Sequence, residues 1–151
     1  MSKYDTFGSY PQRSLASAEA ALLTVWPSLC RYHDDLVLVG GLAVYYLTRR
    51  DIQGLPGAVT LDVDLGISLA ASGGQYGTVK SDLEGLGFVS EDQRLVRRRG
   101  DIALYIDFLT EDSNQNALGS RVVDEVIANV VPGINRALAR YRTVVLEGTD
   151  G

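Results

Sequence analysis

The sequence is poor in cysteine, histidine and lysine, and each shortage excludes a class of protein. A chain of 151 residues with one cysteine, Cys30, cannot form the disulfide framework of a small secreted domain. One histidine, His33, excludes zinc sites made from cysteine and histidine pairs, and also reactions that need two histidines. Lysine is limited to Lys3 and Lys80, and the net charge of −5 disfavours tight, non-specific binding to nucleic acids.

A long hydrophobic run is also missing. No apolar segment approaches the roughly 18 residues that a membrane-spanning helix requires. The first residues, Met1–Asp5, do not follow the pattern of a secretory signal peptide. We therefore expect a cytoplasmic protein, with a loose arm over residues 1–13 and a single domain over residues 14–151.

Short periodic segments separated by glycine and proline predict a mixture of helices and strands. We expect a helix that begins with Ser14 as its N-cap, continues to about Tyr32 and is disturbed late by Pro27. Residues 122–131 fit neither the helix nor the strand pattern cleanly. The other expected elements are strands over 36–39, 59–69, 88–89, 95–99 and 102–109, helices over 40–50, 78–86 and 134–141, and a strand-like run over 143–146. This order predicts an α+β (α/β) fold in which a sheet packs against helices.

The clearest pattern is a strict alternation from Val59 to Leu69. Apolar residues occupy every second position, and Asp62 and Asp64 occupy positions between them. Since side chains alternate between the faces of a strand, the two carboxylates leave the same face, about 7 Å apart at their Cα atoms. Asp107 lies on the polar face of a later strand, and it joins the other two if both strands belong to one sheet.

Three carboxylates on one face need a counter-charge, because like charges a few ångströms apart repel strongly in a partly buried site. A hard divalent cation such as Mg²⁺ supplies this charge, and one or two ions are compatible with three acidic ligands. Gly40-Gly41, placed between a strand and a helix, adds an anion site. The absence of side chains there lets a phosphate approach the backbone N–H groups closely.

Three motifs therefore follow one another along the chain, in Val39–Ala43, Thr60–Leu65 and Tyr105–Leu109. In this order they resemble the nucleotidyltransferase superfamily of the polymerase-beta type, and the resemblance covers roughly residues 14–110. Within it the chain is most similar to the AbiEii/AbiGii-type toxin branch of bacterial toxin–antitoxin and phage-abortive systems. The resemblance implies a nucleotidyltransferase-like mixed sheet packed against helices. It also implies transfer of a nucleoside monophosphate from an NTP to RNA, protein or a small molecule, and an antitoxin partner for a toxin.

The same resemblance implies roles for individual residues. Asp62 and Asp64 would ligate the metal, and Asp107 would bind metal or deprotonate the acceptor. Gly40 and Gly41 would hold the triphosphate. Mg²⁺, as one or two ions, would be the cofactor, and the NTP would be the substrate.

Two departures from the family's pattern concern the nucleotide site and the length. Members of the branch often carry an arginine two residues before the threonine of the Asp-x-Asp strand, where this chain has Ala58 before Thr60. We expect Arg49 or Arg50 to take the place of that arginine and to bind the nucleotide together with Thr60. The family usually continues into a larger helical region, whereas this sequence stops at Gly151, so we expect a fragment or a minimal form.

Other functions share some of these residues. A calcium loop is excluded, because it requires Asp or Asn at position 66 and an acid at position 73, where the chain has Gly66 and Gly73. A catalytically inactive nucleotidyltransferase-like binding module and an aminoglycoside-type nucleotidyltransferase both remain alternatives. We expect Arg97–Arg99, with Arg94 nearby, to be a solvated strand end, and His33 to be a surface or capping residue.

Overall fold

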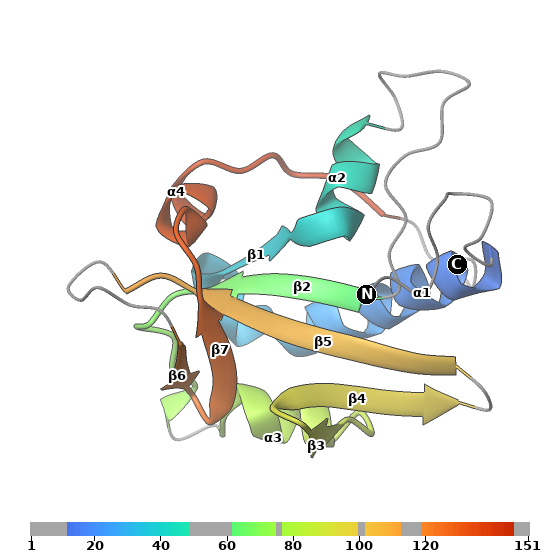
Figure 1. Cartoon of the computed structure of the whole chain (residues 1–151), viewed down its shortest axis with the longest axis horizontal. Helices are drawn as coiled ribbons and strands as arrows, with labels where there is room; N and C mark the ends of the chain where they lie inside the picture. Colours follow the sequence, from blue (N-terminus) through green and yellow to red (C-terminus); the bar gives the residue numbers. More distant parts are fainter. Residues whose placement is uncertain (1–11, 49–61, 75–76, 100–101, 113–118, 147–151) are drawn as a thin grey trace.

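The computed structural model describes residues 12–48, 62–74, 77–99, 102–112 and 119–146, and Figure 1 shows how their elements are arranged. The first part of the chain forms α1 (Gln12–Ser28), the 3-10 helix η2 (Cys30–Asp35), β1 (Leu36–Val39), α2 (Gly40–Thr48) and β2 (Asp62–Ile67). The second part forms α3 (Val79–Glu84), β3 (Val89–Glu91), β4 (Arg94–Arg99), β5 (Ile102–Thr110), β6 (Ser120–Val123), β7 (Val126–Val130) and α4 (Ile134–Ala139). The prediction of a mixed α and β fold is confirmed.

A seven-stranded mixed sheet runs through the described part of the chain, in the order β1-β2-β5-β4-β3. β2 and β5 are parallel, whereas β1 is antiparallel to β2 and β4 is antiparallel to β5. β4 and β7 share one edge of β5: β4 pairs with Ile102–Ile106, and β7 pairs in parallel with Phe108–Thr110. β6 then pairs with β7. The whole sheet is therefore organised around β5.

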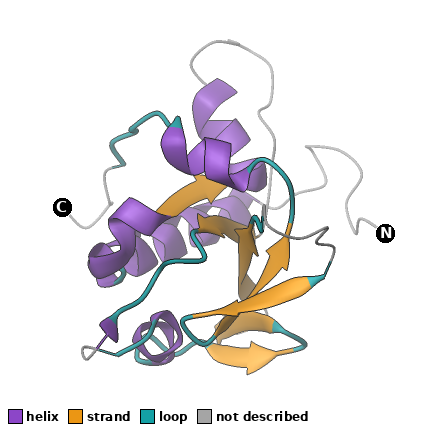
Figure 2. Ribbon diagram, turned by 90° about the vertical axis from the view of Figure 1, so that its left-hand side faces the viewer, coloured by secondary structure: helices purple, strands orange, loops and turns teal. Residues whose placement is uncertain are grey.

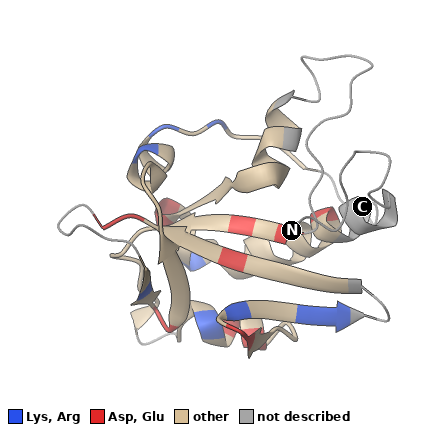
Figure 3. Ribbon diagram, viewed as in Figure 1, with Lys and Arg blue, Asp and Glu red and all other residues tan. Residues whose placement is uncertain are grey.

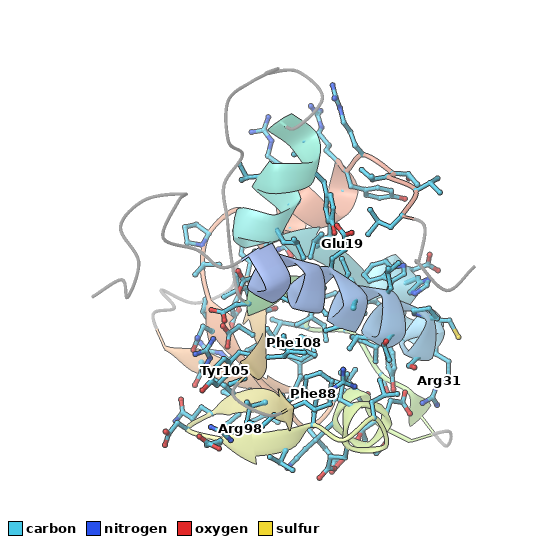
Figure 4. The ribbon with its side chains drawn as sticks, turned by 90° about the vertical axis from the view of Figure 1, so that its right-hand side faces the viewer. Glu19, Arg31, Phe88, Arg98, Tyr105 and Phe108 are labelled. Carbon is cyan, nitrogen blue, oxygen red and sulfur yellow. The ribbon has the colours of Figure 1, made fainter. Side chains whose placement is uncertain are left out.

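One face of the sheet holds most of the hydrophobic core, under α1 and α3. The side chains of β2 and β5 on this face are almost inaccessible to water, as are those of the two helices that meet them. Figure 4 shows Phe88 and Phe108 in this interior. The main members are Val63, Leu65, Ile67, Ile106 and Phe108 from the sheet, Leu22 and Val25 from α1, and Val79 and Leu83 from α3.

The opposite face is only partly covered by helices. α2 and α4 pack over β1 and β2, and a side chain at Gly66 of β2 would meet Ile134 of α4. In Figure 2 the strands have no helix on their right-hand side. This open part, formed by β2, β5 and β4, positions the charged residues described below.

The described residues confirm most of the expected elements and correct their limits. β2 begins at Asp62 and ends at Ile67, while Val59–Leu61 lie outside the described residues. α1 begins at Gln12, so Ser14 is inside the helix and is not its N-cap. Thr110 belongs to β5 and not to a loop: it is fully buried, and its Oγ1 donates a 2.7 Å hydrogen bond to the Ile67 carbonyl. The strand-like run over 143–146 forms no strand.

The ambiguous segment over 122–131 is part of a hairpin formed by β6 and β7. Its turn places Asp124 and Glu125 at φ values of 47° and 72°. Two consecutive residues with positive φ are typical of the tight turn that joins antiparallel strands. Neither residue is glycine or asparagine, so the sequence lacks the usual signal for such a turn. Among the described helices, none has the length and hydropathy needed to cross a membrane.

Candidate functional site

The three predicted carboxylates meet on the open face of the sheet, where β2 and β5 run side by side (Figure 3). The parallel register pairs Asp64 with Asp107 and Asp62 with Tyr105. Residues two apart on a strand share a face, so all four side chains leave the same side of the sheet. The core residues Val63, Leu65 and Ile106 leave the other side and anchor both strands. The sequence prediction that Asp62, Asp64 and Asp107 come together is confirmed.

Gly40 lies directly against this cluster. It follows Val39, which pairs with Asp64 across β1 and β2, and it begins α2. A Cβ at Gly40 would collide with the carboxylate of Asp64, and the backbone there has a φ of +75°. Glycine is therefore required at position 40 for both space and conformation. The first residue of α2 consequently lies against an acidic side chain.

Arg94 neutralises part of the cluster, and the sequence prediction did not assign it to the site. Its Nε and Nη2 donate to the two oxygens of Asp107, each at 2.7 Å. Nη2 also lies 3.1 Å from Oδ2 of Asp62. The guanidinium carbon is 4.0 Å from the centre of the Tyr105 ring. Arg94 is thus held by a two-pronged salt bridge, a second carboxylate and an aromatic face.

The turn between β3 and β4 brings Arg94 into this position. Asp92 and Gln93 adopt φ values of 50° and 67°, and β4 begins with the next residue. The pairing of Leu95 with Ile106 then places Arg94 opposite Asp107. Alternation along β4 separates Arg94 from Arg97, and this is the signal in the sequence that could have distinguished them.

Asp64 has no such partner. Within the described residues, no side chain or backbone group forms an ion pair or a hydrogen bond with its carboxylate. Burial, together with the charges of Asp107 and Asp62, raises its pKa from 3.8 to about 6. Burial also raises the pKa of Asp62, and the charge of Arg94 opposes both shifts, with the addition of a hydrogen bond at Asp62. The open face therefore contains a carboxylate that would be stabilised by a cation.

The fit of this cluster to a metal ion depends on Arg94. Within the described ranges, no group of three or more His, Cys, Asp or Glu side chains is already arranged to hold a metal. Arg94 holds both oxygens of Asp107 and one oxygen of Asp62. The donors themselves suit a hard cation, because Mg²⁺ prefers carboxylate oxygens. The residues therefore fit a divalent cation if Arg94 releases the two carboxylates.

The remaining predicted residues lie apart from this cluster or beyond what is described. Arg49, Arg50 and Thr60, which we expected to bind the nucleotide, fall outside the described residues. Arg98 lies on the same side of the sheet as Tyr105 (Figure 4) but forms a two-pronged salt bridge with Glu91 of β3 at 2.6 and 2.7 Å.

Arg97 and His33 point elsewhere. Arg97 leaves the other face of β4, where it donates to the Leu86 carbonyl and lies over Phe88. His33 is exposed and stacks on Trp26, with ring centres 4.5 Å apart, in agreement with the expected surface role. Neither residue takes part in the acidic cluster.

A shallow recess of about 250 Å³ borders the cluster at Arg94. It lies between the β3–β4 and β6–β7 turns, with Leu95, Ile106 and Phe108 among its apolar lining residues. Lys80 and Glu125 are among the charged residues around it. Arg94 is the residue that belongs to both the recess and the acidic cluster.

Comparisons with known proteins identify no family for this chain. No family model matches the sequence, and no curated protein and no solved structure matches it.

Proposed function

We propose that the protein is a Mg²⁺-dependent nucleotidyltransferase that transfers a nucleoside monophosphate from an NTP to an acceptor. The observation that carries this proposal is the contact between the start of α2 and the carboxylate of Asp64, which forms no ion pair with the described residues. A phosphate bound at the helix start would be attracted by the N–H groups of Gly40 and Gly41. The same phosphate would be repelled by Asp64 unless a cation lay between them. Anion and cation sites in direct contact are what a metal–triphosphate substrate requires.

Each residue of the cluster has a role in this proposal. Asp62 and Asp64 would hold the metal, and Asp107 would complete the ligand set or accept the proton of the attacking hydroxyl. Gly40 and Gly41 would orient the triphosphate through their backbone. When bound, Mg²⁺ would neutralise charge on the phosphates and favour departure of pyrophosphate.

The test is incorporation of labelled NTP into total RNA, cell lysate or the protein itself. We expect Asp62→Asn and Asp64→Asn to reduce transfer by about 100-fold or more, because loss of a metal ligand removes several kcal/mol of transition-state stabilisation. Asn preserves the shape of Asp and removes its charge. Asp107→Asn is expected to reduce transfer to a similar extent.

Asp82→Asn provides the matched control, since Asp82 pairs with Arg31 and belongs to α3, on the opposite side of the sheet from the acidic cluster. This variant should transfer at the wild-type rate. Absence of transfer from any of the four NTPs would reject the enzymatic function. Equal activity of the Asp64→Asn and Asp82→Asn variants would reject the assignment of the site.

A second function, a binding module without catalysis, is favoured by the salt bridges of Arg94. In that case the cluster is already neutralised in part, and the domain binds a nucleotide or a partner protein without reacting. Binding of NTP without incorporation of the label, under the same conditions, would favour this function over the enzyme.

The acceptor distinguishes the proposed subclasses. An AbiEii/AbiGii-type toxin would label RNA or protein and would slow bacterial growth when expressed, unless an antitoxin partner is present. An aminoglycoside-type enzyme would label the small molecule instead. The three acceptor classes can be tested in parallel with the same labelled NTP.

A further inference from the structure

We infer that Arg94 is the internal counter-ion of the acidic cluster, and that a divalent cation competes with Arg94 for Asp107 and displaces it on binding. This inference rests on the proposed metal site, but it concerns a residue to which the motifs give no role. It makes Arg94 a positioning residue that competes with the metal for the same oxygens.

The geometry of Arg94 supports competition. Its two nitrogens engage both oxygens of Asp107, so a cation that bound there with the guanidinium in place would be limited to the remaining lone pairs. The contact with Oδ2 of Asp62 extends the competition to a second carboxylate. A guanidinium and a divalent cation on the same oxygens would lie a few ångströms apart, and the repulsion between their charges sets one against the other.

The Arg94 side chain is also not sealed into the cluster. It is about one third exposed, so solvent reaches the guanidinium. Tyr105 offers an aromatic face beside the cluster. Arg94 can therefore move from Asp107 toward solvent while the ring of Tyr105 remains beside it.

Titration of the metal-free protein with Mn²⁺, without nucleotide, tests the competition directly. Electron paramagnetic resonance of the free ion gives the affinity without reference to activity. We expect Arg94→Gln to bind Mn²⁺ about tenfold more tightly than the wild type, because a competing cation has been removed. Equal or weaker binding by a folded Arg94→Gln variant would overturn the inference.

Arg98→Gln is the matched control. Arg98 lies on the same strand and forms a two-pronged salt bridge too, but with Glu91 and not with the cluster. Its substitution should leave the Mn²⁺ affinity unchanged. An equal gain in Arg98→Gln would overturn the inference, since the effect would then reflect net charge and not competition at Asp107.

A second measurement uses the wild-type protein, so it does not depend on whether a variant of Arg94 folds. The Nε–H groups of arginines held in two-pronged salt bridges can be followed by nuclear magnetic resonance of nitrogen-labelled wild-type protein. We expect Mg²⁺ to shift or broaden the Arg94 signal while the Arg98 signal stays in place. An unchanged Arg94 signal at saturating Mg²⁺ would overturn the inference.

These outcomes are separate from those that test the enzyme. Tighter Mn²⁺ binding by Arg94→Gln, in a protein that transfers no nucleotide, would support the inference and reject the function. Transfer by the wild type, with unchanged Mn²⁺ affinity in Arg94→Gln, would support the function and overturn the inference.

Discussion

On the open face, neighbouring side chains neutralise the charge of Arg94, whereas no described residue forms an ion pair with Asp64. Arg94 is held by two carboxylates and an aromatic ring. Asp64 has a raised pKa and, among the described residues, no cation in contact with it. Functional sites commonly contain a group whose charged form is destabilised in this way, because the ligand provides the missing partner.

The raised pKa of Asp64 predicts a pH-dependent loss of stability in the metal-free protein. The pKa is about 6 in the folded state, above its ordinary value of 3.8, so protonation of Asp64 favours folding. This contribution is fully present at low pH and is lost as the pH rises through about 6. We expect Asp64→Asn, which cannot ionise, to be more stable than the wild type above that pH by about 1 kcal/mol after solvent screening.

Urea denaturation in the presence of a chelator measures this effect. The difference between Asp64→Asn and the wild type should be small at about pH 4 and should grow to its full value at about pH 8. A variant less stable than the wild type at the higher pH would contradict the assignment of Asp64 as an uncompensated carboxylate.

Among the elements, the junction between β1 and α2 fixes the geometry of the site. Gly40 follows the last residue of β1 and begins α2 with positive φ, and Asp64 of β2 fills the space where its side chain would be. The helix start and the carboxylate are therefore held together by backbone geometry and not by a side-chain hydrogen bond.

We expect Gly40→Ala to destabilise the fold by about 2–4 kcal/mol, because it adds a collision with Asp64 to the strain of a positive φ. Gly74→Ala is the matched control: φ is +58° there, and a Cβ would meet nothing within 4 Å. The control should lose only about 1–2 kcal/mol, the cost of the left-handed conformation. Thermal unfolding compares the two, and equal losses would show that Gly40 is not packed against Asp64.

Local patterns predicted the strands that carry the acids, but not how the strands pair. Strict alternation placed Asp62 and Asp64 on one face and Asp107 on the polar face of its strand. The role of Arg94 depends on the register of β4 against β5, which arises from long-range pairing. The β6–β7 hairpin was missed for a related reason, since Asp124 and Glu125 adopt a turn that usually needs glycine or asparagine.

For the whole molecule, the two faces of the sheet differ in how far helices cover them. One face packs against α1 and α3 and contains the core, whereas the other is left partly open by α2 and α4. The net charge of −5 includes three acids concentrated on that open face. A bound divalent cation would reduce this charge where an anionic nucleotide has to approach.

The central claim is that Mg²⁺ and the acidic cluster together transfer a nucleoside monophosphate, and the position of the label in the NTP tests it most directly. We predict that label on the α-phosphate enters the acceptor with Mg²⁺ present, that label on the γ-phosphate does not, and that a chelator or Asp64→Asn abolishes incorporation. Incorporation of the γ-label, or of the α-label with equal efficiency in chelator, would contradict the account.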